Sequence, residues 1–262
     1  MRPASTLRSP PCPKRSRPLV ADRAAVIATA LFVLVTFGAA AGQATIFDSY
    51  RAALASRKTP ANMEFMYTVT RSGPQRIVTE QHRVYWTASG LERNDTISIN
   101  GTDLVPPRSR MLHRTEWPYD PGQFEVSTDD YSTVVTGVGV IANRKAYVLK
   151  LARSAQADFV VTSLYVDAKT RLPLRQAFNV AGADCQGSGS IDFMPVGIYW
   201  LPSFVSVICT GTAQGAAPPP VFKEAIRFSG YSFPAAIPPD VFGQSATPLV
   251  SPTANAGTDL TP

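Results

Sequence analysis

Side chains suited to acid–base or metal chemistry are sparse in this chain of 262 residues. Only His82 and His113 could serve as imidazole bases or metal ligands near neutral pH. His82 stands in a strand-like run, which is typical of a surface histidine or a hydrogen-bonded core histidine. Asp129 and Asp130 are adjacent, so on a strand they face opposite sides and cannot act as a carboxylate pair. We therefore expect a turn role for the two aspartates.

The sequence also lacks the motifs that position catalytic groups. It contains no G-x-S-x-G elbow, P-loop, G-x-G-x-x-G fingerprint, H-E-x-x-H or C-x-x-C. We predict that the protein is not an enzyme and that it uses no metal or cofactor. An exported hydrolase is a less favoured alternative.

Cys185 and Cys209 are the two thiols in the body of the chain. If the flanking segments form a hairpin centred on Gly197, the two cysteines lie directly opposite each other. Opposed Cβ atoms in a sheet are about 4.5–5.5 Å apart, close to what a disulfide needs. The sequence leaves two interpretations open: a disulfide in an oxidising compartment, or two small buried hydrophobic side chains.

The N-terminus resembles an export signal. A basic leader precedes Ala24 to Ala41, 18 residues without a charge, and small residues follow up to Ala44. The positive leader is expected to stay cytoplasmic, which places the body on the far side of a membrane, as in a periplasm. The segment is either a cleaved signal or, as we favour, a retained inner-membrane anchor; a buried core helix is the remaining alternative.

Most of the net charge of +6 comes from the N-terminal segment. Residues 1–44 hold six basic side chains against Asp22 alone, which leaves nineteen basic and eighteen acidic side chains for the rest. A nucleic-acid binder needs a basic stripe on its folded domain, so we predict that nucleic acid is not a partner.

The elements that must position any site begin with a short helix. Thr45 opens a capping-box pattern, Phe47, Tyr50 and Leu54 recur at helical spacing, and Pro60 ends the pattern. We expect these three apolar side chains to form the buried face of a helical lid.

From Met63 onward the apolar period changes to two, and turn residues separate runs of 8 to 15 residues. This pattern predicts an antiparallel meander, with Asn100-Gly101 as a hairpin turn. Residues 101–128, broken by prolines, are expected to be a long connection over the sheet. The predicted organisation is a basic leader, a signal or anchor, a folded domain and a disordered tail (1–23, 24–44, 45–243 and 244–262).

Several strands are apolar on both faces, as in the run from Phe159 to Val166. A flat antiparallel sheet with one solvated face would be polar on one side. The predicted fold is therefore mainly β: a strongly curved antiparallel sheet forming an unclosed β-barrel with a short helical lid, preceded by one N-terminal membrane segment.

Several of these strands are similar to a known family. The run from Ala146 to Leu151, then Leu164-Tyr165-Val166-Asp167 followed by Thr170 and Leu172-Pro173-Leu174-Arg175, resembles the core of the bacterial outer-membrane lipoprotein carrier and receptor (LolA/LolB-like) superfamily. Later segments resemble its closing strands: Ile191-Asp192-Phe193, Gly197, Trp200-Leu201-Pro202, Phe228 to Phe233 and Ile237 to Phe242.

The resemblance implies an unclosed barrel with a helical lid and an apolar interior that can hold acyl chains. The first functional hypothesis is extracytoplasmic binding of a lipid or of lipoprotein acyl chains. The alternative is a membrane-tethered envelope sensor or interaction domain, whose cavity is filled by its own side chains and which binds a protein partner.

Overall fold

The computed structural model describes residues 46–114, 120–122, 126–182, 185–211 and 219–243. The chain divides into two units, residues 1–42 and 43–262, and every described residue lies in the second. The described residues of this unit form eleven strands: β1 (Asn62–Ser72), β2 (Ile77–Thr87), β3 (Leu91–Ile99), β4 (Thr102–His113), β5 (Tyr131–Ile141), β6 (Arg144–Arg153), β7 (Phe159–Asp167), β8 (Pro173–Ala181), β9 (Gln186–Val196), β10 (Tyr199–Thr210) and β11 (Val221–Ser232).

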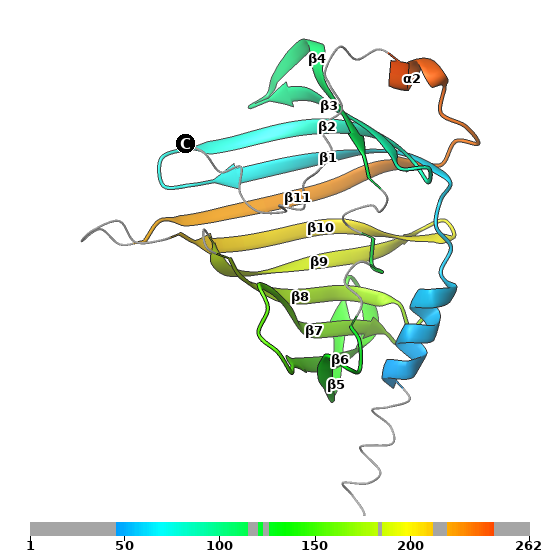
Figure 1. The fold of residues 1–262 in the computed structure, drawn as a ribbon, viewed down its shortest axis with the longest axis vertical. Helices are drawn as coiled ribbons and strands as arrows, with labels where there is room; N and C mark the ends of the chain where they lie inside the picture. Colours follow the sequence, from blue (N-terminus) through cyan, green and yellow to red (C-terminus); the bar gives the residue numbers. More distant parts are fainter. Residues whose placement is uncertain (1–45, 115–119, 123–125, 183–184, 212–218, 244–262) are drawn as a thin grey trace, which may run out of the picture. The chain divides into compact units, whose positions relative to one another are not determined.

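All eleven strands form one antiparallel sheet in the order β4-β3-β2-β1-β11-β10-β9-β8-β7-β6-β5 (Figure 1). Two meanders, β1 to β4 and β5 to β11, are joined where the last strand pairs with the first. The sheet is unclosed, with β4 and β5 as its edges. The prediction of a mainly β chain with an open antiparallel sheet is confirmed.

In the part of the chain that the structure describes, two short helices accompany the sheet. Residues 46–56 are helical, and this first helix packs against the β5–β7 end of the sheet. The second, α2 (Pro239–Gly243), lies near β3, where Arg93 Nη1 donates to the carbonyl of Val241 at 2.7 Å. No helix among the described residues is long and apolar enough to span a membrane. The predicted capping residue Thr45, the leader, the anchor or signal and the whole of the predicted tail lie outside those residues.

The prediction of a long connection over residues 101–128 was wrong for its first half, which forms strand β4. Asn100 and Gly101 both have positive φ, 51° and 79°, and make the tight turn into β4. Pro106 and Pro107 lie within β4, with a cis bond before Pro106. They are tolerated because β4 is an edge strand with partners on one side only.

Candidate functional site

One row of side chains crosses eight neighbouring strands on the face that the first helix covers. Each member is the register partner of the next, from β6 to β2. We call this set the core row: Leu149, Leu164, Gln176, Ile191, Val205, Ile226, Val69 and Glu80. All but Glu80 are at most 4% exposed. The row is therefore a wall of apolar side chains that includes one polar residue, Gln176, and ends at the carboxylate of Glu80.

The predicted lid residues lie over one end of this wall. Phe47, Tyr50 and Leu54 are all buried and belong to the same apolar cluster as Leu149 and Leu164. Gln176 Nε2 donates to the hydroxyl of Tyr50 at 3.4 Å, which ties the helix to β8. The helical spacing of the three side chains thus corresponds to one buried helix face.

A polar cluster stands at the other end of the row. Arg71 on β1 donates from Nη1 to Glu80 on β2 at 2.9 Å and from Nε to Glu224 on β11 at 2.7 Å. His82 lies beside Glu80, with Nε2 3.4 Å from the carboxylate oxygen. The Tyr67 ring stacks on the His82 ring with centroids 4.4 Å apart. The apolar wall is thus bounded by charged groups on three adjacent strands.

Burial and neighbouring charged groups shift the pKa values in this cluster. Burial raises the pKa of Tyr67 to about 12. Burial also lowers the pKa of His82, against the opposing pull of its Asn94 hydrogen bond and of Glu80. For Arg71, burial would lower the pKa, but Glu224 and Glu80 outweigh it and raise the pKa. At neutral pH the cluster therefore holds a neutral His82 beside a charged Arg71.

Buried polar atoms on this face that have no hydrogen-bond partner among the described residues include Nε1 of Trp86 and Oε1 of Gln176. Trp86 belongs to β2 and Gln176 belongs to β8. A buried polar atom without a partner costs about 1–3 kcal/mol, so this face offers hydrogen-bonding capacity on both sides of the run from Ile191 to Val69.

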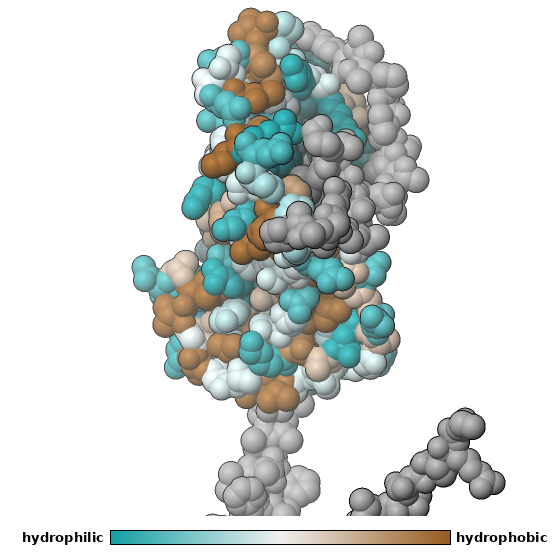
Figure 2. All heavy atoms as spheres, turned by 90° about the vertical axis from the view of Figure 1, so that its left-hand side faces the viewer, coloured by the Kyte–Doolittle hydropathy of each residue, from teal (hydrophilic) through white to brown (hydrophobic). Residues whose placement is uncertain are grey.

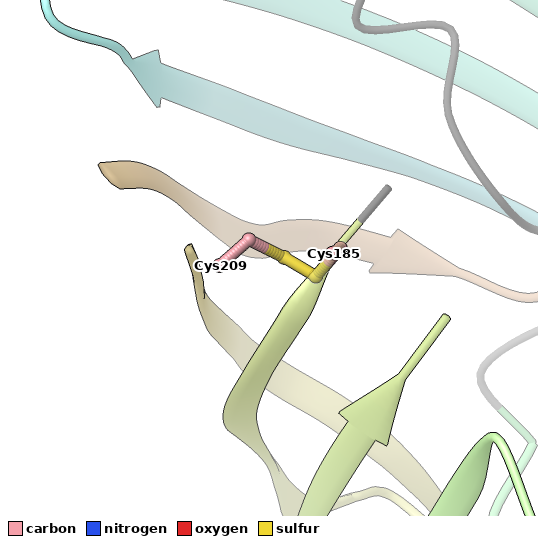
Figure 3. Close-up of a disulfide and its surroundings, with 2 residues drawn as sticks. All are labelled: Cys185 and Cys209. Carbon is pink, nitrogen blue, oxygen red and sulfur yellow. A yellow bond between two sulfur atoms is a disulfide. The ribbon is translucent and has the colours of Figure 1, made fainter. Parts of the chain in front are cut away.

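Cys185 and Cys209 form a disulfide with Cα atoms 5.2 Å apart (Figure 3). The register expected for the pair was wrong, because Cys209 lies opposite Gly187 and Cys185 precedes β9. The turn contains two residues, Gly197 and Ile198, and the register shifts again between Pro202 and Phe204. Gly187 lets the β9 and β10 backbones approach closely beside the disulfide, since a Cβ there would lie 1.9 Å from the carbonyl oxygen of Ile208.

The remaining candidate residues from the sequence do not lie together in one site. His113 is exposed at the end of β4, and Asp129 and Asp130 are exposed just before β5. Within the described parts of the chain no group of three or more potential ligands could hold a metal ion. Sequence reasoning missed the Arg71–Glu80–Glu224 cluster, because its members are brought together only by the pairing of β11 with β1.

No family model matches the chain, and no curated protein matches it in sequence. Solved structures with a similar fold include a DUF1329 family protein from Desulfovibrio piger, 9% identical with a TM-score of 0.40, covering 76% of this chain and 95% of that one. A LolA superfamily protein from Nitrosomonas europaea is 12% identical with a TM-score of 0.36, covering 76% and 96%.

A putative outer-membrane lipoprotein-sorting protein domain from Vibrio parahaemolyticus is 11% identical with a TM-score of 0.41, covering 75% of this chain and 95% of that one. The Pseudomonas aeruginosa MucA/MucB complex matches at 13% identity and a TM-score of 0.27, covering 73% and 100%. At TM-scores this low we draw no functional conclusion from the matches.

Proposed function

We propose that this chain is an extracytoplasmic, non-enzymatic binding protein that shelters an apolar ligand, a lipid or lipoprotein acyl chains, on the core row of its sheet. The observation that carries the proposal is the run Ile191, Val205, Ile226 and Val69, four apolar side chains on four adjacent strands with polar groups at both ends. Each methylene that such a wall removes from water contributes about 0.8 kcal/mol, so an acyl chain needs few polar contacts.

The first helix is the proposed lid. Its buried face is tied to the sheet by apolar contacts at the β5–β7 end and by the Tyr50–Gln176 hydrogen bond to β8. Apolar contacts are non-directional, so a short helix can move away from a sheet and return. Opening would expose Gln176, whose Oε1 could then accept a hydrogen bond from a ligand.

The disulfide supports an oxidising, extracytoplasmic compartment. Residues 24–41 would hold the domain at the membrane, or would be removed after export. A retained anchor suits a tethered receptor or sensor better than a carrier that diffuses between membranes.

The test is native mass spectrometry of the full chain, together with exchange of a fluorescent long-chain fatty acid. Leu54→Ala and Leu201→Ala delete the same group from equally buried sites, one on the helix and one on β10 outside the helix-packed cluster. A lid predicts that Leu54→Ala speeds probe release about tenfold more than Leu201→Ala does. Equal release rates would remove the lid role, and no lipid or probe on the wild-type chain would remove the ligand.

The burial of the core row favours a second candidate. Its apolar members are already screened from solvent, as expected for an interior filled by the protein's own side chains. The chain would then be a membrane-tethered envelope sensor or interaction domain whose sheet is a scaffold for a protein partner. A wild-type chain that retains no lipid and binds no probe would support this candidate.

A further inference from the structure

The two edges of the sheet are built differently. β4 carries two prolines and the charged residues Asp103, Arg108 and Arg110, which discourage pairing with another strand. β5 contains neither a proline nor a charged residue over its eleven residues. No strand among the described residues pairs with its outer edge. A long, uncharged edge strand is a ready template for strand addition.

Exposed apolar side chains mark the same strand. Val134, Val138 and Val140 are exposed by 51%, 56% and 69%, although they belong to a regular strand. Figure 2 shows hydrophobic surface at the lower end of the sheet, where Figure 1 places β5 and β6. Pairing along this edge would cover part of that surface.

The β5–β6 ladder determines which backbone groups face outward. The two-residue turn Ala142-Asn143 makes Ile141 and Arg144 a hydrogen-bonded pair, after which bonded and non-bonded pairs alternate. The register shifts between Val135 and Gly137, where Thr136 is the extra residue. By this alternation the amides and carbonyls of four residues point to the open edge: Thr133, Val135, Val138 and Val140.

A two-fold axis would pair these four residues with the same four residues of a second copy. With the axis between Thr136 and Gly137, Thr133 faces Val140 of a second copy and Val135 faces Val138. The paired side chains lie on the same face of the sheet in both copies, because an antiparallel pair has its two-fold axis perpendicular to the sheet. The extra residue at the bulge is what brings the two halves of the edge into this match.

The ends of the strand are complementary in charge. Asp129 and Asp130 precede β5, are exposed and form no salt bridge with any described residue. Lys145 is exposed just beyond the turn at the other end. Antiparallel self-pairing brings the acidic end of each copy to the basic end of the other. We propose that β5 binds β5 of a second copy of this chain, making one sheet continuous across a two-fold dimer.

The test is sedimentation equilibrium of the full chain in a density-matched detergent. The wild-type chain is expected to be a dimer. Val140→Lys occurs twice per dimer and should weaken association about tenfold, since a charged edge residue opposes pairing. Thr133→Glu combined with Val140→Lys should restore association to within about threefold of wild type, because the register places these residues opposite each other. Circular dichroism would verify that every variant keeps its sheet.

The matched control is Val105→Lys, which adds the same charge at an exposed valine on the opposite edge. It should leave association unchanged. A monomeric wild type, or equal weakening by Val105→Lys, would overturn the proposal. A folded double variant that fails to regain association would overturn it too. Edge amides of β5 that gain hydrogen-exchange protection only with a different protein would assign the edge to that protein.

Discussion

Asp167, at the end of β7, is the residue whose replacement makes the sharpest prediction. Its Oδ1 accepts hydrogen bonds from the amides of Lys169 and Thr170, at 2.9 and 2.7 Å, and from the Thr170 hydroxyl at 3.0 Å. Its Oδ2 accepts from Arg144 Nε at 2.7 Å. The carboxylate thus closes the β7–β8 turn and joins it to β6.

Asp167→Asn keeps the shape but turns one acceptor into a donor. If Oδ1 keeps the turn amides, the new NH2 group faces Arg144 Nε, so two donors meet. A hydrogen bond to a charged group contributes about 1.5–3 kcal/mol, and water compensates Arg144 in part because its side chain is 33% exposed. We expect the free energy of unfolding in urea to fall by about 2–3 kcal/mol, with an unchanged slope against urea.

The loss should depend on pH. Burial would raise the pKa of Asp167, but the hydrogen bonds from Arg144, Thr170 and Lys169 outweigh it and hold the pKa below its ordinary value. A lowered carboxyl pKa contributes stability above the unfolded value of about 3.9, and this stability is lost as pH falls through the folded pKa. The gap between wild type and Asp167→Asn should therefore be full at neutral pH and close in acid.

The control is Asp103→Asn, at an exposed aspartate of β4 outside any salt bridge formed by the described residues. It should change stability by less than about 0.5 kcal/mol. The reasoning is refuted if Asp167→Asn is equally silent, or if its effect does not vary with pH. Probe binding should survive in Asp167→Asn, since the turn is a structural device and not a ligand contact.

Three further variants test the site and its supports. Gly187→Ala should lower stability by about 1–3 kcal/mol in thermal unfolding, because its Cβ would strike the Ile208 carbonyl, whereas Gly243→Ala has open space and should be neutral. Burial lowers the pKa of His82, beside Glu80 and Arg71, so stability present above about pH 6.5 falls as pH drops through the folded pKa. In His82→Gln, the free energy of unfolding measured by urea titration should fall less between pH 7 and pH 5 than in the wild type. An equal fall in the two proteins would contradict the prediction. Gln176→Leu removes a buried carbonyl oxygen that has no partner and should raise the free energy of unfolding by about 1 kcal/mol. The loss of the hydrogen bond to Tyr50 offsets part of this gain. A marked fall in the free energy of unfolding would mean that Oε1 has a partner.

The sequence was informative wherever local chemistry determines structure. The period of two predicted the strands, the spacing of Phe47, Tyr50 and Leu54 predicted the buried face of the first helix, and Asn100-Gly101 predicted a hairpin turn. Each of these signals lies within a few residues of the structure that it specifies.

The pairing of strands that are distant in the sequence could not be predicted in this way. The prolines of β4 suggested a connection, but a strand tolerates prolines when it lies at the edge of a sheet. Whether β4 lies at the edge depends on how all the other strands pair. The expected Cys185–Cys209 register missed one extra turn residue and one bulge. The Arg71 cluster depends on the β1–β11 pairing, which brings Arg71 to Glu224, 153 residues away in the sequence.

The core row and the β5 edge are linked through the first helix. The helix rests on a cluster that includes Tyr131 and Val135 of β5, so the strand that we expect to pair is also part of the platform under the lid. β5 is held by hydrogen bonds on one side only, and such strands open more readily than central ones. Pairing with a second copy would hold its other side and stabilise the platform. Dimer formation would therefore favour the closed lid, and ligand release would be coupled to dissociation.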